Sequence, residues 1–378
     1  MRIKAMMAGF SFFLILGMCG CGGGSNASTT PPAGTQVAAP NVGARDAQNG
    51  AMVVSLTSGT AGATIHYTVD GSTPKATSPV YEAPFLVASN VTVKAYAAAS
   101  GSNDSTVSSR DFTLNIAPGT LVWSDEFTNN TGSSLQPDNS VWGYDTGASG
   151  FGNHELEDYC AYGSTSAPCD PANPNAYVGT DGMLHILARK DANGKYTSAR
   201  MKSQGLFSLQ FGRLEAKIWV PEGQGIWPAF WTLGNSIATV DWPACGEQDI
   251  MERVNAAKTP LDWNEGSVHG TGFTGDVGLG TIYNFPTGQT AAGWHTYGIL
   301  WQKNSVAFYV DDSTKPYVTY TNPASLSKLN GAVWPFDTGD SVFLILNVAV
   351  GGDWPGAPDA STIFPAEMKV DYVRVYTN

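Results

Sequence analysis

Glu247-Gln248-Asp249-Ile250-Met251-Glu252 is the most informative stretch of the sequence, because it contains three carboxylates within one apolar-flanked segment. Side chains two positions apart on a strand point to the same face, so Glu247 and Asp249 agree and Glu252 is out of phase. One added residue of a β-bulge, either Ile250 or Met251, would return Glu252 to that face. The sequence therefore predicts a bulged strand that presents a row of three acids.

The composition favours strands over helices along the rest of the chain. The protein has 378 residues, of which 42% are hydrophobic and 14% are charged, and it contains 43 Gly and 22 Pro. Abundant Val, Thr, Tyr and Trp, with few helix-periodic stretches of Leu, Glu and Lys, favour strands joined by turns. We expect an all-β protein with room for a large domain and a smaller one.

Residues 1–21 have the pattern of an export signal. Arg2 and Lys4 precede an apolar run at residues 10–16, and small residues follow it. The run is too short to span a bilayer comfortably. Cys21 stands in a context that resembles the lipobox of bacterial lipoproteins, which predicts an acylated cysteine and a lipid anchor in a membrane. We therefore expect an exported lipoprotein at the cell surface or outer membrane; the alternative is ordinary secretion after cleavage nearby.

The acidic charge balance bears on the kind of partner. The net charge of −12 becomes about −14 when Arg2 and Lys4 are removed with the signal. Nucleic acid or a sulfated polysaccharide would meet net repulsion, whereas a neutral glycan would not. The sequence therefore predicts no nucleic-acid partner and weakly disfavours sulfated substrates.

The two cysteines Cys160 and Cys169 flank a polar loop. In an exported protein oxidation is expected, so the sequence predicts a disulfide bond between them, with a metal-binding pair as the alternative. Cys245 has no partner by this account, and we interpret it as a small buried residue of the strand that carries the acids.

The chain divides into four parts. Residues 22–40 are rich in Gly, Ser, Thr, Pro and Ala, which is typical of a flexible linker. Residues 41–116 alternate between apolar and polar side chains, which predicts a small β-sandwich. Residues 119–378 form one catalytic-sized domain that holds all 11 Trp.

The small sandwich resembles the immunoglobulin-like module at the C-terminus of chitobiases. The resemblance rests on residues 63–74, 78–81 and 93–97. It leaves two roles open for this part of the chain, a spacer or stabilising appendage and a carbohydrate-binding module.

Three clustered acids are what hydrolysis of a glycosidic bond requires. One carboxylate must be ionised and act as nucleophile, and a second must hold a proton as general acid. Clustered negative charge raises the pKa of the second acid, and Asp249 between the two can share a proton or hydrogen bond with Glu247. The alternatives are a calcium site and a solvated acidic strand. Part of the Trp set would line a sugar-binding groove, because a flat ring matches the C–H face of a pyranose, and the rest would pack in the core.

These motifs resemble glycoside hydrolase family 16, in the laminarinase-like form with Met251. Further matching motifs lie in order along the domain, at residues 212–217 and 346–356 and at Trp123-Ser124-Asp125-Glu126-Phe127, Gly152-Asn153-His154-Glu155-Leu156, Gly225-Ile226-Trp227-Pro228-Ala229-Phe230-Trp231 and Val370-Asp371-Tyr372-Val373-Arg374-Val375-Tyr376. The resemblance implies a concanavalin-like β-jelly roll of two curved antiparallel sheets and retaining endo-hydrolysis of β-1,3-glucan.

The resemblance also implies roles for single residues. Glu247 would be the nucleophile, Glu252 the acid/base and Asp249 the assisting acid. The expected substrate-binding residues are Trp227, Trp231, His269, Asn153 and Glu155. His154 and Asp158 depart from the pattern of the family at its outer sugar-binding positions.

A structural calcium ion is implied by the resemblance as well. Its ligands would be Glu126, Asp371 and the backbone of Gly182, on the face of the sandwich remote from the acids. Carboxylates, carbonyls and waters suit calcium, which takes six to eight oxygen ligands.

Other functions with the same fold remain open at this point. The same mechanism could act on mixed-linkage β-glucan or on a red-algal galactan, and a non-catalytic glucan-binding lectin could use the same surface. The three intact acids favour the enzyme. We expect a monomer whose partner is a polysaccharide substrate.

Overall fold

The computed structural model describes residues 34–255 and 262–378. The predicted signal at 1–21, Cys21 and most of the 22–40 linker lie outside the described residues. The described part of the chain is almost entirely β-structure, with one helix of four residues, α1 (Ile237–Val240), and two short 3-10 helices, η1 (Gly275–Val277) and η2 (Ala324–Leu326). The predicted all-β class is confirmed.

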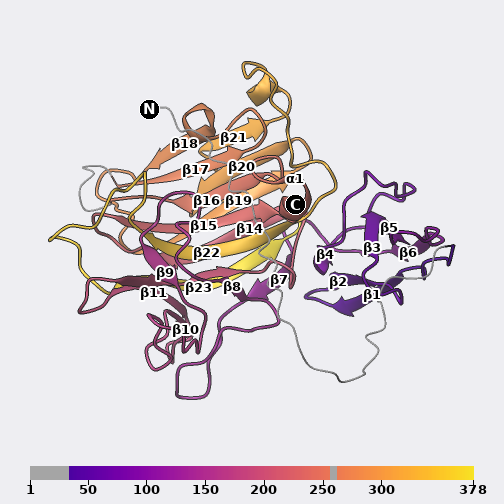
Figure 1. Ribbon diagram of the computed structural model, residues 1–378. Helices are drawn as coiled ribbons and strands as arrows, with labels where there is room; N and C mark the ends of the chain where they lie inside the picture. The colour runs from indigo at the N-terminus through magenta and orange to yellow at the C-terminus, as the bar shows by residue number, and fades with distance from the viewer. Residues whose placement is uncertain (1–33, 256–261) are drawn as a thin grey trace, which may run out of the picture.

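Two β-sandwiches of unequal size follow one another along the chain (Figure 1). The smaller sandwich consists of two three-stranded sheets with the orders β1-β2-β4 and β3-β5-β6. Its strands are β1 (Asn41–Asp46), β2 (Met52–Thr57), β3 (Thr64–Thr68), β4 (Phe85–Val87), β5 (Val91–Ala98) and β6 (Ser108–Phe112). Ile65, Val93 and Ala95 are buried between its sheets, as their alternation with polar residues predicts.

One sheet of the larger sandwich has seven strands in the order β18-β17-β16-β15-β22-β13-β8. In this order the strands are β18 (Leu279–Asn284), β17 (Trp263–His269), β16 (Glu247–Glu252), β15 (Ile226–Gly234), β22 (Val342–Val350), β13 (Arg200–Lys202) and β8 (Gly143–Asp145). All neighbouring strands in this sheet are antiparallel.

The other sheet of the larger sandwich has ten strands, with the main order β21-β20-β19-β14-β23-β11-β12-β9; β10 pairs with β11, and β7 pairs with β23. Its strands are β7 (Leu121–Asp125), β9 (Glu157–Tyr159), β10 (Ala176–Val178), β11 (Leu184–Lys190), β12 (Tyr196–Ser198), β14 (Gly212–Trp219), β19 (Trp294–Gln302), β20 (Ser305–Val310), β21 (Val318–Thr321) and β23 (Ala366–Tyr376).

The core of the larger sandwich lies between these two sheets. Phe230 and Leu346 from the seven-stranded sheet are fully buried in one cluster with Ile186 and Val373 from the ten-stranded sheet. One face of the seven-stranded sheet is therefore apolar and packed. Its other face is left to carry polar and aromatic side chains, and this is the face on which the acids lie.

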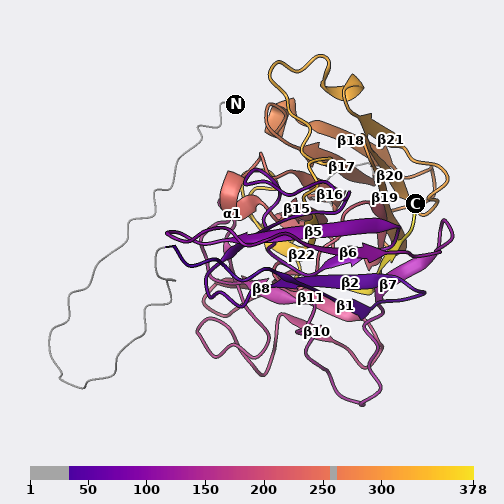
Figure 2. The same ribbon diagram turned by 90° about the vertical axis from the view of Figure 1, so that its right-hand side faces the viewer.

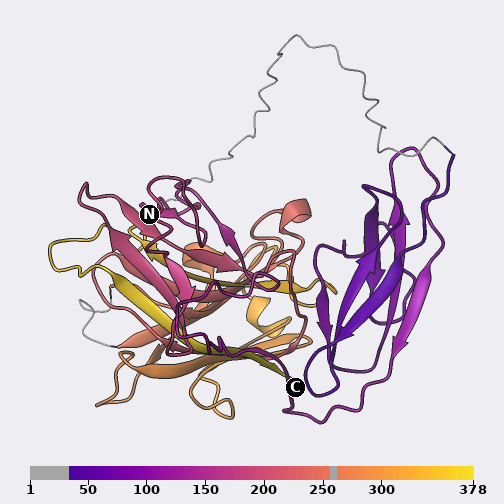
Figure 3. The ribbon, with the colours of Figure 1, turned by 90° about the horizontal axis from the view of Figure 1, so that it is seen from below.

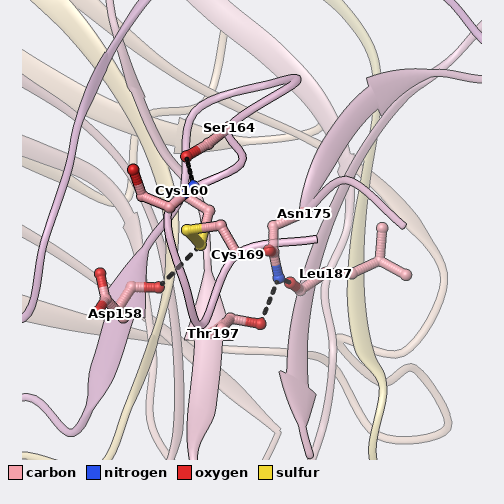
Figure 4. The surroundings of a disulfide bond; sticks show 8 residues. Asp158, Cys160, Ser164, Cys169, Asn175, Leu187 and Thr197 are labelled. Carbon is pink, nitrogen blue, oxygen red and sulfur yellow. Dashed lines mark hydrogen bonds between the residues drawn. A yellow bond between two sulfur atoms is a disulfide. The ribbon is translucent and has the colours of Figure 1, made fainter. Parts of the chain in front are cut away.

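Cys160 and Cys169 are joined by a disulfide bond, the pairing that the sequence predicts (Figure 4). The bond closes the polar loop that leaves β9, and the backbone N–H of Cys160 donates to the carbonyl of Ser198 in β12. Cys245 is free and buried, as expected, but it lies in the turn before β16 and not in the strand itself. Among the described residues, no helix has the length and apolarity that crossing a membrane requires.

Candidate active site

The predicted β-bulge lies in β16. On one side Asp249 pairs with Ser267 and Glu252 pairs with Glu265, so Ile250 and Met251 together lie opposite a single residue of β17. The same shift occurs against β15. Ile250 and Met251 are buried in the core at 1% and 0% exposure. The bulge therefore turns two apolar side chains inward and returns Glu252 to the face that carries Glu247 and Asp249.

The central acid, Asp249, is bonded from the neighbouring strand β17. Its Oδ2 accepts a hydrogen bond from Ser267 Oγ at 2.6 Å and lies 3.0 Å from His269 Nε2. His269 Nε2 is also 3.8 Å from Glu247 Oε1. His269 therefore links Asp249 to Glu247, the residue with which the sequence allows Asp249 to share a proton or hydrogen bond.

Glu247 is approached from a different part of the chain by an indole. Trp242 Nε1 donates to Glu247 Oε2 at 3.1 Å. The Trp242 ring also lies 6.3 Å from the His269 ring, centroid to centroid. One oxygen of Glu247 thus faces an indole N–H and the other faces an imidazole.

Among the residues that the structure describes, Glu252 has a neutral donor and no cation in hydrogen-bond contact. Trp227 Nε1 donates to Glu252 Oε1 at 2.9 Å. The backbone N–H of Glu252 donates to Asn264 Oδ1 at 3.2 Å, which holds the end of the bulge against β17. The surroundings of Glu252 are therefore less suited to a negative charge than those of Glu247.

The electrostatics separate the two outer acids. Burial, and then the charge of Asp249, raise the pKa of Glu247 to about 8, although His269, Arg200 and Trp242 counteract this. Burial and the charges of Asp249 and Glu247 raise the pKa of Glu252 well above its ordinary value. Both acids resist ionisation, and Glu247 has the positive partners that favour its charged form.

His269 carries the compensating positive charge. Burial lowers its pKa, but the hydrogen bond and charge of Asp249, together with the charges of Glu247 and Glu252, outweigh burial and raise the pKa to about 9. At neutral pH His269 is therefore an imidazolium that lies 3.0 Å from Asp249 and 3.8 Å from Glu247. This gives a physical reason for the resemblance-based expectation that His269 belongs to the site.

Asn153 and Glu155 belong to a hydrogen-bond network that reaches the seven-stranded sheet. Glu155 accepts from Asn153 Nδ2 at 3.2 Å and from the Tyr159 hydroxyl at 2.8 Å. The Tyr159 oxygen accepts from Asn347 Nδ2 at 3.2 Å, and Asn347 Oδ1 accepts from Trp231 Nε1 at 2.8 Å. The network connects both predicted sugar-binding residues to Trp231, which pairs directly with Asp249 across the strands.

The two predicted sugar platforms have different surroundings. The Arg200 guanidinium lies 4.8 Å from the Trp231 ring centroid, so a cation occupies one side of that ring. Trp227 meets Trp354 edge to face at 5.5 Å, and Trp354 lies 6.0 Å from Trp263. With Trp354 at 42% exposure, these three indoles form an aromatic group beside Glu252.

Sequence reasoning missed Trp242, Ser267, Arg200 and Trp354 as contributors to the site. Ser267 had a local signal, because it is two positions from His269 and so faces the same way on a strand. Trp242 and Arg200 had no local signal. The contact of Trp242 with Glu247 depends on the conformation of a turn, and the contact of Arg200 with Trp231 depends on the pairing of strands that are distant in the sequence. Trp354 lies within a motif of the family resemblance.

The calcium ion stays a prediction, and the contacts of its expected ligands do not fit it as they stand. Both oxygens of Glu126 accept from Arg374, each at 2.8 Å, and Asp371 Oδ2 accepts from Lys217 Nζ at 2.8 Å. Gly182 lies in a turn with φ of 74°. A cation would have to displace an arginine and a lysine that already neutralise these carboxylates. Acylation of Cys21 also stays a prediction.

Glu247, Asp249 and His269 lie close together. A carboxylate oxygen or ring nitrogen of each lies within 4.8 Å of those of the other two, and within the described ranges this is the cluster of three such side chains. The charged form of His269 places a positive charge next to both acids of this group. The arrangement can therefore perform proton transfer and nucleophilic attack with its own side chains.

Glu247→Gln is expected to stabilise the fold near neutral pH. The folded-state pKa of about 8 exceeds the ordinary value of 4.5, so the folded protein holds a proton that the unfolded chain releases, and stability falls as pH rises from about 4.5 to 8. Glutamine removes this cost, on the order of 2–4 kcal/mol at pH 7.5 and close to zero at pH 4.

Chemical denaturation at several pH values measures this difference. The matched control is Glu126→Gln, because the hydrogen bonds of Arg374 lower the pKa of Glu126 and the change should destabilise instead. A Glu247→Gln variant that loses stability as pH rises from 4 to 7.5, relative to the unmodified protein, would contradict this account of the site.

Comparison with known proteins agrees with this geometry. Residues 166–374 match the family model described as Glycosyl hydrolases family 16, and residues 54–112 match the model Fn3 associated. The second match agrees with the additional β-sandwich that the sequence predicts at the N-terminal side.

Curated relatives include a Beta-glucanase of Rhodothermus marinus, 39% identical over 273 residues, which cover 68% of this chain and 84% of that protein. Glucan endo-1,3-beta-glucosidase A1 of Niallia circulans is 36% identical over 286 residues, covering 69% of this chain and only 38% of the relative. Among solved structures, the catalytic domain of an endo-1,3-beta-glucanase (laminarinase) from Thermotoga petrophila is 38% identical, with a TM-score of 0.58, covering 70% of this chain and 99% of that one. The chain belongs to glycosyl hydrolase family 16.

Proposed function

We propose that the protein is an endo-acting hydrolase that cleaves the β-1,3 bonds of laminarin-like glucan with retention of configuration. The observation that carries this proposal is the bulge in β16, which puts Glu247, Asp249 and Glu252 on one face of a sheet in unequal surroundings. The names of the glucanase and laminarinase relatives support the choice of bond and sugar.

In the first step Glu247 attacks the anomeric carbon and Glu252 gives its proton to the leaving glycosidic oxygen. The bond from the anomeric carbon to that oxygen breaks as the bond to the Glu247 carboxylate forms. His269 and Trp242 face the oxygens of Glu247 and favour its ionised form. Glu252 lies next to two other acids, which keeps its proton in place until the leaving group takes it.

In the second step a water molecule attacks the anomeric carbon and gives its proton to Glu252, while the bond from that carbon to Glu247 breaks and releases the free carboxylate. Esterified Glu247 has lost its negative charge, and that charge contributes to the raised pKa of Glu252. The pKa of Glu252 therefore falls when the intermediate forms, and the group changes from acid to base. The product leaves with the β-configuration that it had in the polymer.

Asp249 acts in this scheme through His269. It accepts from Ser267 and from His269, so it fixes the orientation of the imidazolium beside Glu247. It also supplies part of the negative charge that keeps Glu252 protonated. Asp249 thus supports both outer acids without contacting the bond that breaks.

There are two kinds of alternative function. In the first, the same mechanism acts on a different polysaccharide; in the second, the same surface binds glucan without hydrolysing it. Mixed-linkage β-glucan and red-algal galactan are the other substrates, and a glucan-binding lectin is the non-catalytic alternative. The acidic net charge of the chain disfavours a sulfated galactan, and the three acids with divergent surroundings disfavour a lectin.

The cellular location, the lipid anchor and the calcium ion are proposals as well. We infer an exported protein, held to a membrane through a lipid on Cys21 and working as a monomer on an extracellular glucan. Electrospray mass spectrometry of the purified protein would detect the lipid, and metal analysis after dialysis would detect calcium. Neither feature is needed for the chemistry of the three acids.

Glu247→Gln and Glu252→Gln are each expected to lower the rate of laminarin hydrolysis on the order of 1000-fold or more, because each removes a group that acts on the reacting bond. Both variants should still bind laminarin, and both should still unfold in a cooperative thermal transition, which shows that they are folded. Reducing-sugar release measures the rate, with Glu126→Gln as the control. Near-normal turnover in either variant would disprove the assigned roles.

A product profile on laminarin, curdlan, lichenan, agarose and κ-carrageenan tests the choice of sugar. We expect oligosaccharides of several lengths from laminarin and curdlan early in the reaction, because an endo-acting enzyme cuts internal bonds. Activity confined to the two galactans would overturn the laminarinase proposal. Binding to laminarin without any cleavage would favour the lectin.

A further inference from the structure

The smaller sandwich is joined to the seven-stranded sheet by backbone hydrogen bonds. Leu86 N donates to the carbonyl of Ser208, and Ser208 N donates to the carbonyl of Pro84, both at 2.9 Å. The next residue, Leu209, pairs with Val342 at the start of β22 through bonds of 2.9 and 3.0 Å. A ladder of hydrogen bonds therefore runs from β4 of the smaller sandwich into the sheet that carries the acids.

A second contact joins the smaller sandwich to the ten-stranded sheet. Gln48 N donates to the carbonyl of Val122 in β7 at 3.1 Å. Ala51 and Val53 are buried in the same core cluster as Trp123. The two sandwiches share a core at this end, and Figures 2 and 3 show the smaller one against the end of the larger that holds β7 and α1.

A third contact is made by Tyr67 of β3. This residue is 3% exposed, and its ring stacks on Phe85 at 5.0 Å. Its hydroxyl faces Asp340 and Ser341, and burial followed by the charge of Asp340 raises the pKa of Tyr67. Tyr67 thus reaches the residues that immediately precede β22.

Asp340 and Ser341 also hold the beginning of residues 235–246, the segment between β15 and β16. Asp340 Oδ2 accepts from the backbone N–H of Ser236 at 2.9 Å, and Asn235 Nδ2 donates to Ser341 Oγ at 2.9 Å. Asn235 N also donates to the carbonyl of Ser341 at 2.9 Å. The same two residues therefore contact the smaller sandwich on one side and this segment on the other.

The 235–246 segment leads directly to the active site. It includes α1, reverses direction at Asp241, where φ is 57°, and is closed by a hydrogen bond from Gly234 N to the carbonyl of Gly246 at 3.0 Å. Trp242 lies just after the reversal and is 48% exposed, so little packing holds its ring. The position of its Nε1 over Glu247 depends on the backbone of the segment.

Trp242 differs from the charged groups that face Glu247. Asp249, His269 and Arg200 lie on strands of the seven-stranded sheet, and Glu252 lies at the end of the bulge. The sheet fixes those groups, whereas the segment fixes Trp242. A change in the segment would therefore affect Glu247 through one hydrogen bond and leave the other contacts intact.

We propose that the smaller sandwich is a positioning element of the active site. Through Tyr67 and the pair Asp340 and Ser341 it holds the 235–246 segment so that Trp242 donates to Glu247. The inference rests on the proposed function in taking Glu247 as the nucleophile. The sequence left two roles open, a spacer or stabilising appendage and a carbohydrate-binding module; the proposal gives the first of these a specific task at the active site.

Hydrogen–deuterium exchange of the full chain tests the structural half of this proposal without activity. In Tyr67→Phe we expect amides of residues 235–246 to exchange several-fold faster than in the unmodified protein. Tyr81→Phe is the matched control, because the Tyr81 ring meets the Tyr67 ring edge to face at 6.4 Å in the same sandwich, and burial raises the pKa of Tyr81 without a contribution from Asp340. Equal exchange of the segment in the Tyr67→Phe and Tyr81→Phe variants would overturn the proposal.

The pH profile of kcat/KM on laminarin tests the functional half. Trp242→Phe removes the donor to Glu247, so the acidic limb should move to higher pH and kcat should fall about tenfold. Tyr67→Phe should move the same limb in the same direction by a smaller amount, and Tyr81→Phe should leave it in place.

A Tyr67→Phe profile identical to that of the unmodified protein, beside a shifted Trp242→Phe profile, would overturn the role of the smaller sandwich and leave that of Trp242. Full activity in Glu247→Gln would instead overturn the proposed function. Exchange of the 235–246 segment would still report the structural contact in that case, so the two failures are distinguishable.

Discussion

The register shift in β16 is the constraint on which the rest of the site depends. A regular strand would send Glu252 toward the core, where a carboxylate without a partner costs several kcal/mol. With Ile250 and Met251 opposite one residue of β17, the two apolar side chains fill the core and the acid stays on the open face. The pairing of β16 with both neighbours holds this shift, so the surrounding sheet fixes the spacing of the acids.

The second requirement is that Glu247 and Glu252 differ in their tendency to ionise, although they lie on one strand. The difference comes from neighbouring elements. β17 supplies His269, and the 235–246 segment supplies Trp242, and both face Glu247. Glu252 receives an indole N–H from Trp227 and lies near two negative charges. Because the smaller sandwich contacts the residues that hold the segment, the environment of Glu247 extends beyond the larger sandwich.

The parts that the sequence predicted are those with local signals. Alternation in residues 65–69, the out-of-phase Glu252 and the two cysteines around a polar loop each depend on neighbours in the chain, and the structure shows the strand, the bulge and the disulfide there. Contacts made through a turn or between strands distant in the sequence gave no such signal. Trp242 reaches Glu247 through a turn, and Arg200 reaches Trp231 through strand order. The sequence allowed Asp249 a shared proton or hydrogen bond with Glu247, and it gave no sign that His269 from the neighbouring strand lies close to both acids.

The central claim is that the bulge gives Glu247 and Glu252 different chemical roles on one face of the sheet. Trapping the enzyme with a 2-deoxy-2-fluoro laminarin oligosaccharide that carries a good leaving group, followed by peptide mass spectrometry, locates the residue that forms the glycosyl ester. We predict a single label on Glu247. A label on Glu252 or Asp249, or an active enzyme that forms no ester and releases α-configured products, would contradict it.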